Sequence, residues 1–161
     1  MDFGLNKEQE MMRKEMRHFC KKELNKEYVQ WMDEHVDFPP DELWQKFVDI
    51  GFFKASIPEE YGGDSLSYLD QMIVYEEICK ASMSVALAVG TTSGFGPRFI
   101  AELGTKAQKE KYLPLIGEGK LKTCMALTEP AGGTDILGAI STFAEEKQDR
   151  CLSLKGCIRF A

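Results

Sequence analysis

The sequence predicts a mainly α-helical fold, a bundle of about five to six helices followed by a few strands of an incomplete β domain. Three observations predict it. Apolar residues recur at helical spacing in the first part of the chain, helix start and stop signals punctuate that part, and short β-type runs follow residue 120. We therefore divide the chain into a helical domain over residues 1–119 and the beginning of a β domain over residues 120–161.

Composition and length fit one compact domain. A chain of 161 residues is about one domain, and 43% hydrophobic with 29% charged residues is ordinary for a globular protein. No apolar run approaches the ~20 residues that a membrane-spanning helix needs, and residues 1–8 do not form a signal peptide. We expect no membrane span and a cytoplasmic location, or the matrix in a eukaryote.

Charge and cysteine spacing exclude two further classes. The net charge is −6 and no basic run is longer than Lys21-Lys22, which argues against a nucleic-acid partner. The five cysteines show no C-x-x-C spacing, and neither His18 nor His35 completes a zinc pattern with them. We expect reduced structural thiols and predict no metal site.

The first helix is expected to begin at Asn6, because Asn6 and Gln9 have the spacing of a capping box. Its apolar stripe consists of Met12, Met16, Phe19, Cys20 and Leu24. A methionine-rich stripe fits ordinary core packing, and it also fits an adaptable ligand-binding face.

The next helix is expected after the prolines of residues 38–41, because proline is tolerated in a first helical turn. Its buried side would be Leu43, Trp44, Phe47, Val48 and Ile50. Gly51 supplies a left-handed stop, and the Pro and Gly content of residues 56–63 indicates a loop.

A third helix is predicted from residue 67 to about residue 79. Its apolar positions are Leu69, Met72, Ile73 and Ile78. Glu76 and Glu77 are expected on its solvent-exposed side.

Residues 81–96 are small and nearly uncharged. Such a stretch lets another helix pack closely, or leaves room for a flat ligand and an acyl chain. Gly104 then ends one helix, Thr105 and Gln108 form the capping box of the next, and Pro114 can bend it.

The sequence pattern changes from helical to β-type after residue 120. Residues 123–127 read as a short buried strand, and residues 140–145 and 151–154 as two more, separated by a turn over residues 147–150. So few strands leave unpaired edges, which predicts the beginning of a larger β domain.

The loop of residues 128–135, T-E-P-A-G-G-T-D, follows the first of these strands directly. Gly132 and Gly133 allow close approach to backbone N–H groups, which can bond the polar edge of a planar cofactor. The same composition is typical of an ordinary turn. Neither a phosphate loop nor a dinucleotide-binding glycine motif is present.

Three segments resemble the acyl-CoA dehydrogenases, flavoenzymes of fatty-acid and related acyl-CoA metabolism. They are I-P-E-E-Y-G-G at 57–63, G-T-K-A-Q-K-E-K-Y-L-P at 104–114 and A-L-T-E-P-A-G-G-T-D at 126–135. They occur in the family's order, and the resemblance runs from about Phe3 to Leu154. It implies a helical domain, a middle β domain and a four-helix C-terminal domain, usually in a tetramer. This chain would hold the first domain and the opening of the second.

The resemblance also implies site residues. The T-E-P segment of the family lies against the flavin of FAD, and the loop's last hydroxyl residue meets acyl-CoA. The cofactor contacts carried over by position are Met125, Ala126, Leu127, Thr128, Thr134 and Phe160. The substrate contacts carried over are Thr134, Thr91, Thr92 and Phe95. The Thr128 hydroxyl would bond the pyrimidine edge of the flavin.

Three departures from the family pattern matter. Ala131 stands where the family has glycine, so a left-handed conformation there would be resisted by its β-carbon. Near Phe160 the family's Asn and Lys are missing, although Gly156 and Phe160 match. The glutamate that serves as general base belongs to the C-terminal domain, so no catalytic residue is assigned here.

Two functional hypotheses follow. The first is FAD-dependent oxidation of an acyl-CoA thioester to the α,β-enoyl-CoA, or the reverse reduction, with electron-transfer flavoprotein as electron partner and the fragment nearly inactive alone. Within this enzyme class, an acyl-CoA oxidase is a further alternative. The second is a non-catalytic helical interaction module whose strands pair with another subunit.

Overall fold

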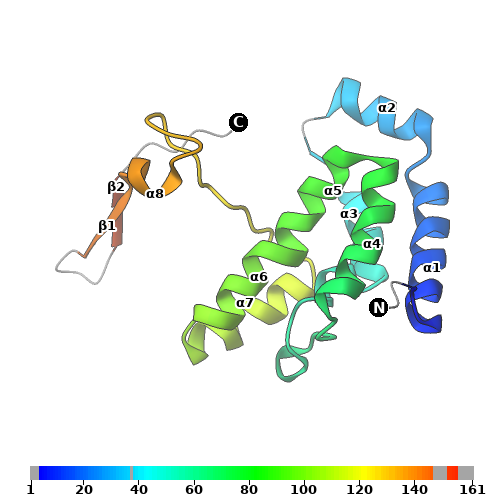
Figure 1. Ribbon diagram of the computed structural model, residues 1–161, viewed down its shortest axis with the longest axis horizontal. Helices are drawn as coiled ribbons and strands as arrows, with labels where there is room; N and C mark the ends of the chain where they lie inside the picture. The colour runs from blue at the N-terminus through cyan, green and yellow to red at the C-terminus, as the bar shows by residue number, and fades with distance from the viewer. Residues whose placement is uncertain (1–3, 37, 147–151, 156–161) are drawn as a thin grey trace. The chain divides into compact units, whose positions relative to one another are not determined.

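The structure is a computed structural model that describes residues 4–36, 38–146 and 152–155 (Figure 1). The chain divides into two compact units, Met1–Cys124 and Met125–Ala161. The prediction of a mainly helical fold is confirmed. The predicted domain boundary between residues 119 and 120 stays a prediction. Within the described ranges, no helix combines the length and the apolar character needed to cross a membrane.

The first unit is made of helices. They are α1 (Lys7–Glu23), α2 (Lys26–His35), α3 (Asp41–Asp49), η1 (Phe52–Lys54), η2 (Glu59–Tyr61), α4 (Tyr68–Ala81), α5 (Met83–Gly90), η3 (Thr91–Phe95), α6 (Gly96–Leu103) and α7 (Lys106–Gly117). Helix α4 packs against α1 on one side and α5 on the other, and α6 packs against α7 (Figure 1).

The predicted helix starts are confirmed. Asn6 and Thr105 both form complete capping boxes, with Gln9 and Gln108 as the reciprocal partners. Helix α2 was not predicted. Its signal is Asn25, whose side chain accepts from the Tyr28 N–H at 2.9 Å and so caps a new helix directly after α1.

The main core lies between α1, α3, α4 and α5. Its buried residues are Met16, Cys20, Leu24, Met32, Leu43, Trp44, Phe47, Phe52, Phe53, Ile78, Val85, Ala86 and Val89. A smaller cluster packs Ile57 against Leu113 and Ile116 of α7. The predicted buried side of α3 is right for its central residues, but Ile50 is 45% exposed. The helix ends there, and Gly51 adopts the left-handed conformation with φ 74°.

The predicted orientation of α4 is wrong in part. Leu69 and Met72 are exposed, whereas Glu77 is buried. The Arg17 guanidinium on α1 bonds both Glu77 carboxylate oxygens at 3.0 Å, and Lys80 bonds one of them at 2.9 Å. A buried carboxylate is tolerated when cations and hydrogen bonds satisfy it, which the sequence pattern of α4 alone does not reveal.

The small residues of 81–96 serve close packing at two points. A β-carbon at Gly90 would overlap the Tyr75 ring of α4, and one at Gly96 would overlap the Thr123 side chain. Residues Thr91–Phe95 form a π-helical turn between α5 and α6. Turns of this kind occur often at functional sites.

The second unit contains α8 (Ile136–Ala139), β1 (Phe143–Glu146) and β2 (Leu152–Lys155). The two strands pair antiparallel, with Phe143 opposite Lys155. They correspond to two of the predicted strands with shifted bounds. The predicted strand over 123–127 is wrong, because these residues form no strand and join no sheet in the part that the structure describes. The predicted turn over 147–150 lies outside the described residues.

Candidate functional site

The segment that enters the second unit is open to solvent. Met125, Ala126, Leu127 and Thr128 are all exposed, with Met125 at 42% and Leu127 at 40%. Their backbone belongs to no described helix or strand. These residues are the predicted flavin contacts, and their side chains and peptide groups are available to a ligand.

The loop that follows is folded by its own hydrogen bonds. The Gly132 N–H donates to the Glu129 carbonyl at 3.1 Å, which closes a turn around Pro130. The Asp135 carboxylate then accepts from the Gly138 N–H at 3.0 Å and begins α8. The sequence TEPAGGTD is therefore a turn, as its composition predicts, and it still leaves Thr134 exposed just before α8.

Glu129 joins this loop to the start of β1. Its carboxylate is 6% exposed and accepts from the Ser141 N–H at 2.7 Å, the Ser141 hydroxyl at 2.5 Å and the Thr142 N–H at 2.9 Å. Hydrogen bonds from Ser141, and next from Thr142, lower the pKa of Glu129 to about 2. The sequence pattern did not identify this contact.

The two neighbouring glycines of the loop differ in what they require. A β-carbon at Gly132 would overlap the Ala139 β-carbon of α8, whereas nothing lies within 4 Å of one at Gly133. Ala131 is not left-handed, since Ser65 is the one described non-glycine residue with positive φ. The expected strain at Ala131 therefore does not arise.

Three threonines hold the end of the first unit in place. The Thr123 N–H donates to the Thr92 hydroxyl at 3.0 Å, that hydroxyl donates to the Thr123 carbonyl at 3.3 Å, and the Thr123 hydroxyl donates to the Thr91 carbonyl at 2.9 Å. Thr92 is 1% exposed. Its hydroxyl is hydrogen-bonded to the Thr123 backbone and is not presented to a ligand in this structure.

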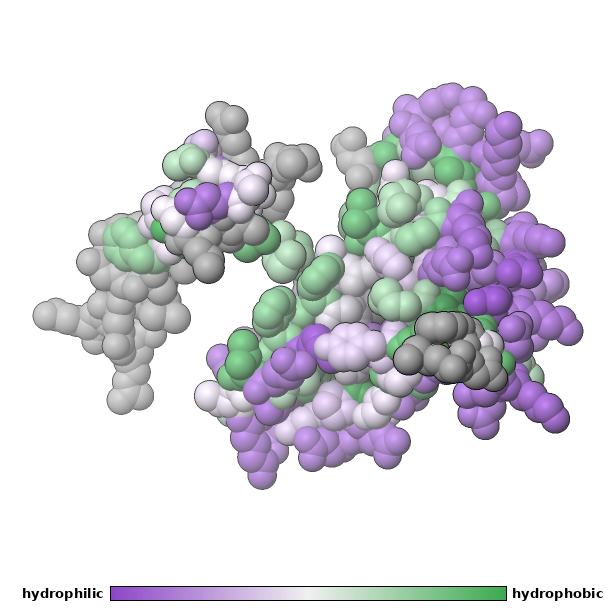
Figure 2. Space-filling view, viewed as in Figure 1, coloured by the Kyte–Doolittle hydropathy of each residue, from purple (hydrophilic) through white to green (hydrophobic). Residues whose placement is uncertain are grey.

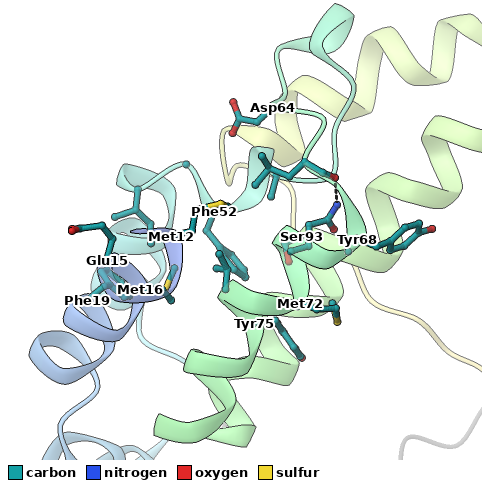
Figure 3. A pocket seen from close by; sticks show the side chains of 18 of the residues that line it. Met12, Glu15, Met16, Phe19, Phe52, Asp64, Tyr68, Met72, Tyr75 and Ser93 are labelled. Carbon is teal, nitrogen blue, oxygen red and sulfur yellow. Dashed lines mark hydrogen bonds between the residues drawn. The ribbon is translucent and has the colours of Figure 1, made fainter. Parts of the chain in front are cut away.

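A cavity of about 1010 Å³ lies within the first unit (Figure 3). Side chains of α1 and α4, with Phe52 between them, form much of its wall, and Phe95 and Phe99 line it from the π-helical turn and α6. The walls are largely apolar, and the charged groups that line it include Glu15, Asp64 and Arg98. Of the three predicted acyl-cavity residues in this unit, Phe95 lines the cavity, and Thr91 and Thr92 do not.

The methionine stripe of α1 contributes to this cavity. Met12 and Met16 both line it, and Met16 is also 8% exposed in the core cluster. Core packing is confirmed for Met16, Cys20 and Leu24 of the stripe, and a ligand-binding role for this face stays a prediction.

The surface of the first unit is divided by character. Figure 2 shows hydrophilic residues gathered over α1 and α2, and hydrophobic residues along α5 and α6. The exposed apolar side chains of α5, η3 and α6 are Met83, Leu87, Phe95, Phe99 and Leu103.

One predicted site residue cannot be placed, because Phe160 lies outside the described residues. Over the described ranges, no group of three or more His, Cys, Asp and Glu side chains is arranged to hold a metal ion.

Known proteins resemble this chain in both sequence and architecture. Residues 6–120 match the family model "Acyl-CoA dehydrogenase, N-terminal domain". Glutaryl-CoA dehydrogenase of Desulfococcus multivorans is 36% identical over 154 residues, which cover 94% of this chain and 39% of that protein. The caffeyl-CoA reductase-Etf complex subunit CarC of Acetobacterium woodii is 36% identical over 146 residues, covering 89% of this chain and 38% of the relative.

A solved structure agrees with them. The acyl-CoA dehydrogenase of Bacillus anthracis complexed with FAD superimposes with a TM-score of 0.81 at 30% identity, covering 94% of this chain and 26% of that one. The chain thus spans well under half the length of the proteins that it matches. By its sequence and its helical architecture, the chain belongs to the acyl-CoA dehydrogenase family and carries the family's N-terminal domain.

Proposed function

We propose that this chain is the amino-terminal part of an FAD-dependent acyl-CoA dehydrogenase. The whole protein would oxidise an acyl-CoA thioester to the α,β-enoyl-CoA or catalyse the reverse reduction, in fatty-acid or related lipid metabolism. The observation that carries this proposal is the exposed segment of residues 125–128, which belongs to no described strand and is followed directly by a hydrogen-bonded loop.

The fit to FAD rests on the chemistry of that segment. Exposed residues outside any described helix or sheet can offer N–H and C=O groups to a ligand, and Thr128 adds a hydroxyl. Met125, Ala126 and Leu127 would lie along the flavin, with Thr128 at its pyrimidine edge and Thr134 and Phe160 as further contacts. The bound flavin would supply the hydride acceptor, and these residues would bind and orient it.

The acyl group needs an apolar volume and a polar anchor. We assign the anchor to the exposed Thr134 hydroxyl and part of the apolar lining to Phe95, which is 51% exposed. Thr91 and Thr92 are the other proposed substrate contacts, and their hydrogen bonds hold Thr123. Each of these assignments is part of the proposal.

We assign the proton-transfer step to no residue of this chain. Glu129 is fully engaged with Ser141 and Thr142, and the low pKa of its carboxyl makes it a weak base. We therefore propose no catalytic residue here and expect the chain alone to be nearly inactive.

Electron-transfer flavoprotein, which the name of the Acetobacterium relative includes, is the proposed electron partner. A homo-oligomer and a cytoplasmic location, or the matrix in a eukaryote, belong to the same proposal.

The test is direct binding of FAD. We expect the purified chain to quench flavin fluorescence in a titration with FAD, because residues 125–128 are presented to solvent. Replacing Thr128 with alanine should weaken binding about ten-fold, the effect of one lost hydrogen bond, while Thr128→Ser should bind like the unaltered chain. Equal affinity of the alanine and serine variants would refute the assignment of the hydroxyl.

One observation favours a second function. The sheet within the described residues has two strands, β1 and β2, so both are edge strands. Such edges suit pairing with another subunit in a non-catalytic interaction module. A chain that forms stable oligomers and binds no flavin in the same titration would support this alternative.

A further inference from the structure

An eleven-residue excursion of the chain, residues 130–140, begins directly after Glu129 and ends directly before Ser141. Its side chain bonds the residues at which the excursion ends, Ser141 and Thr142. Its own carbonyl accepts from Gly132 at the beginning of the same excursion. One residue therefore holds both ends of the loop.

The contacts satisfy the carboxylate on both oxygens. One oxygen accepts from the Ser141 N–H and hydroxyl, and the other accepts from the Thr142 N–H. An ionised carboxylate with 6% exposure would be costly without such partners, so the buried position depends on them. In return, two successive backbone N–H groups before β1 gain a charged acceptor.

One proposed ligand contact lies within the excursion, and another lies just before it. Thr128 directly precedes Glu129, and Thr134 lies between the turn at Gly132 and α8. We infer that Glu129 is a positioning residue that closes residues 130–140 into a fixed loop and so sets Thr128 and Thr134 for the flavin and the acyl-CoA. The inference deepens the proposed function and rests on it. Glu129 itself need not touch either ligand.

The geometry explains why a carboxylate is required. Glutamine has the same length but one acceptor oxygen, so its NH₂ group would face either the Ser141 N–H and hydroxyl or the Thr142 N–H. Aspartate keeps the charge but is shorter by one methylene group. Glu129→Gln is therefore the sharper variant, since it keeps size and removes one set of bonds.

Hydrogen exchange of the 161-residue chain tests the closure without any ligand. In Glu129→Gln we expect the Ser141 and Thr142 amides to exchange roughly ten-fold faster or more, as expected for a loop that opens locally. Ser141→Ala, which removes only the hydroxyl, should show a smaller increase. Glu59→Gln, a change of the same kind at an exposed carboxylate of the first unit, should leave both amides unchanged. Unchanged exchange in Glu129→Gln would overturn the inference.

Titration with FAD tests the positioning role on the same variants. A loop that is closed for only part of the time should raise the FAD dissociation constant by about five-fold or more, while the helical circular dichroism of the first unit stays unchanged. Bound flavin should also show an altered visible absorption band, which a purely structural role would not produce. Faster exchange with unaltered FAD affinity and spectrum would overturn the positioning role. If the unaltered chain binds no FAD, the proposed function fails, and exchange alone then decides whether Glu129 closes the loop.

Discussion

Replacing Glu77 with glutamine should destabilise the helical unit, because Glu77 is a buried carboxylate that ties α4 to α1. Its side chain is 3% exposed and receives two bonds from Arg17 and one from Lys80. The hydrogen bond from Arg17 is the largest cause that lowers the pKa of Glu77 from 4.5 to about 2, against the opposing effect of burial.

The magnitude follows from that shift. A difference of this size corresponds to about 3 kcal/mol of the free energy of unfolding. The Arg17 side chain is 50% exposed, so solvent screening reduces the expected loss to about 2 kcal/mol. We therefore expect the urea midpoint of Glu77→Gln to fall by about 1 M.

The neighbouring residue supplies a matched control. Glu76 is 53% exposed and also pairs with Lys80, at 2.9 Å. Glu76→Gln removes the same charge from the same helix and should change the free energy of unfolding by less than about 0.5 kcal/mol. Urea unfolding followed by circular dichroism compares the two variants. Equal losses in both would refute the reasoning, because burial and the Arg17 contact would then carry no weight.

The pH dependence has a defined sign. Because the folded-state pKa of Glu77 is lowered, its stabilisation is present above the unfolded value of 4.5 and is lost as pH falls toward about 2. The difference between the unaltered chain and Glu77→Gln should therefore be full at pH 7 and shrink steadily below pH 4.5. A difference that grows on acidification would contradict this assignment.

Two further predictions concern glycines. Gly132→Ala should force the loop away from Ala139, so limited proteolysis should cleave residues 130–140 faster. Gly133→Ala is the control: its β-carbon would meet nothing within 4 Å, so this variant should be cleaved at the rate of the unaltered chain. Gly96→Ala should collide with Thr123 and lower the free energy of unfolding by about 2 kcal/mol in a urea titration. Gly94→Ala is the control, because a β-carbon there would meet nothing within 4 Å. If Gly96→Ala is as stable as the unaltered chain, the space between Gly96 and Thr123 is larger than the structure shows. Equal cleavage of the two loop variants would say the same of the space between Gly132 and Ala139.

The local structure of the helical unit could be predicted from the sequence. Capping boxes, the proline before α3 and the left-handed Gly51 act over a few residues, so the residue types alone are sufficient. The same holds for the two strands of the hairpin, whose existence was predicted correctly and whose bounds moved by a few residues. The turn at Gly132 was also recognisable from its composition.

The sequence alone determined that this chain is mainly helical and that its loop resembles a flavin-binding one. The tertiary structure decided which polar groups are satisfied by distant partners. Arg17 lies 60 residues from Glu77, and Thr92 lies 31 residues from Thr123. Glu77 was expected in solvent for this reason, and the roles of Thr92 and Glu129 in the fold were not foreseen. The physical reason is that periodicity and capping depend on neighbours along the chain, whereas burying a charge or a hydroxyl depends on the partners that folding brings to it.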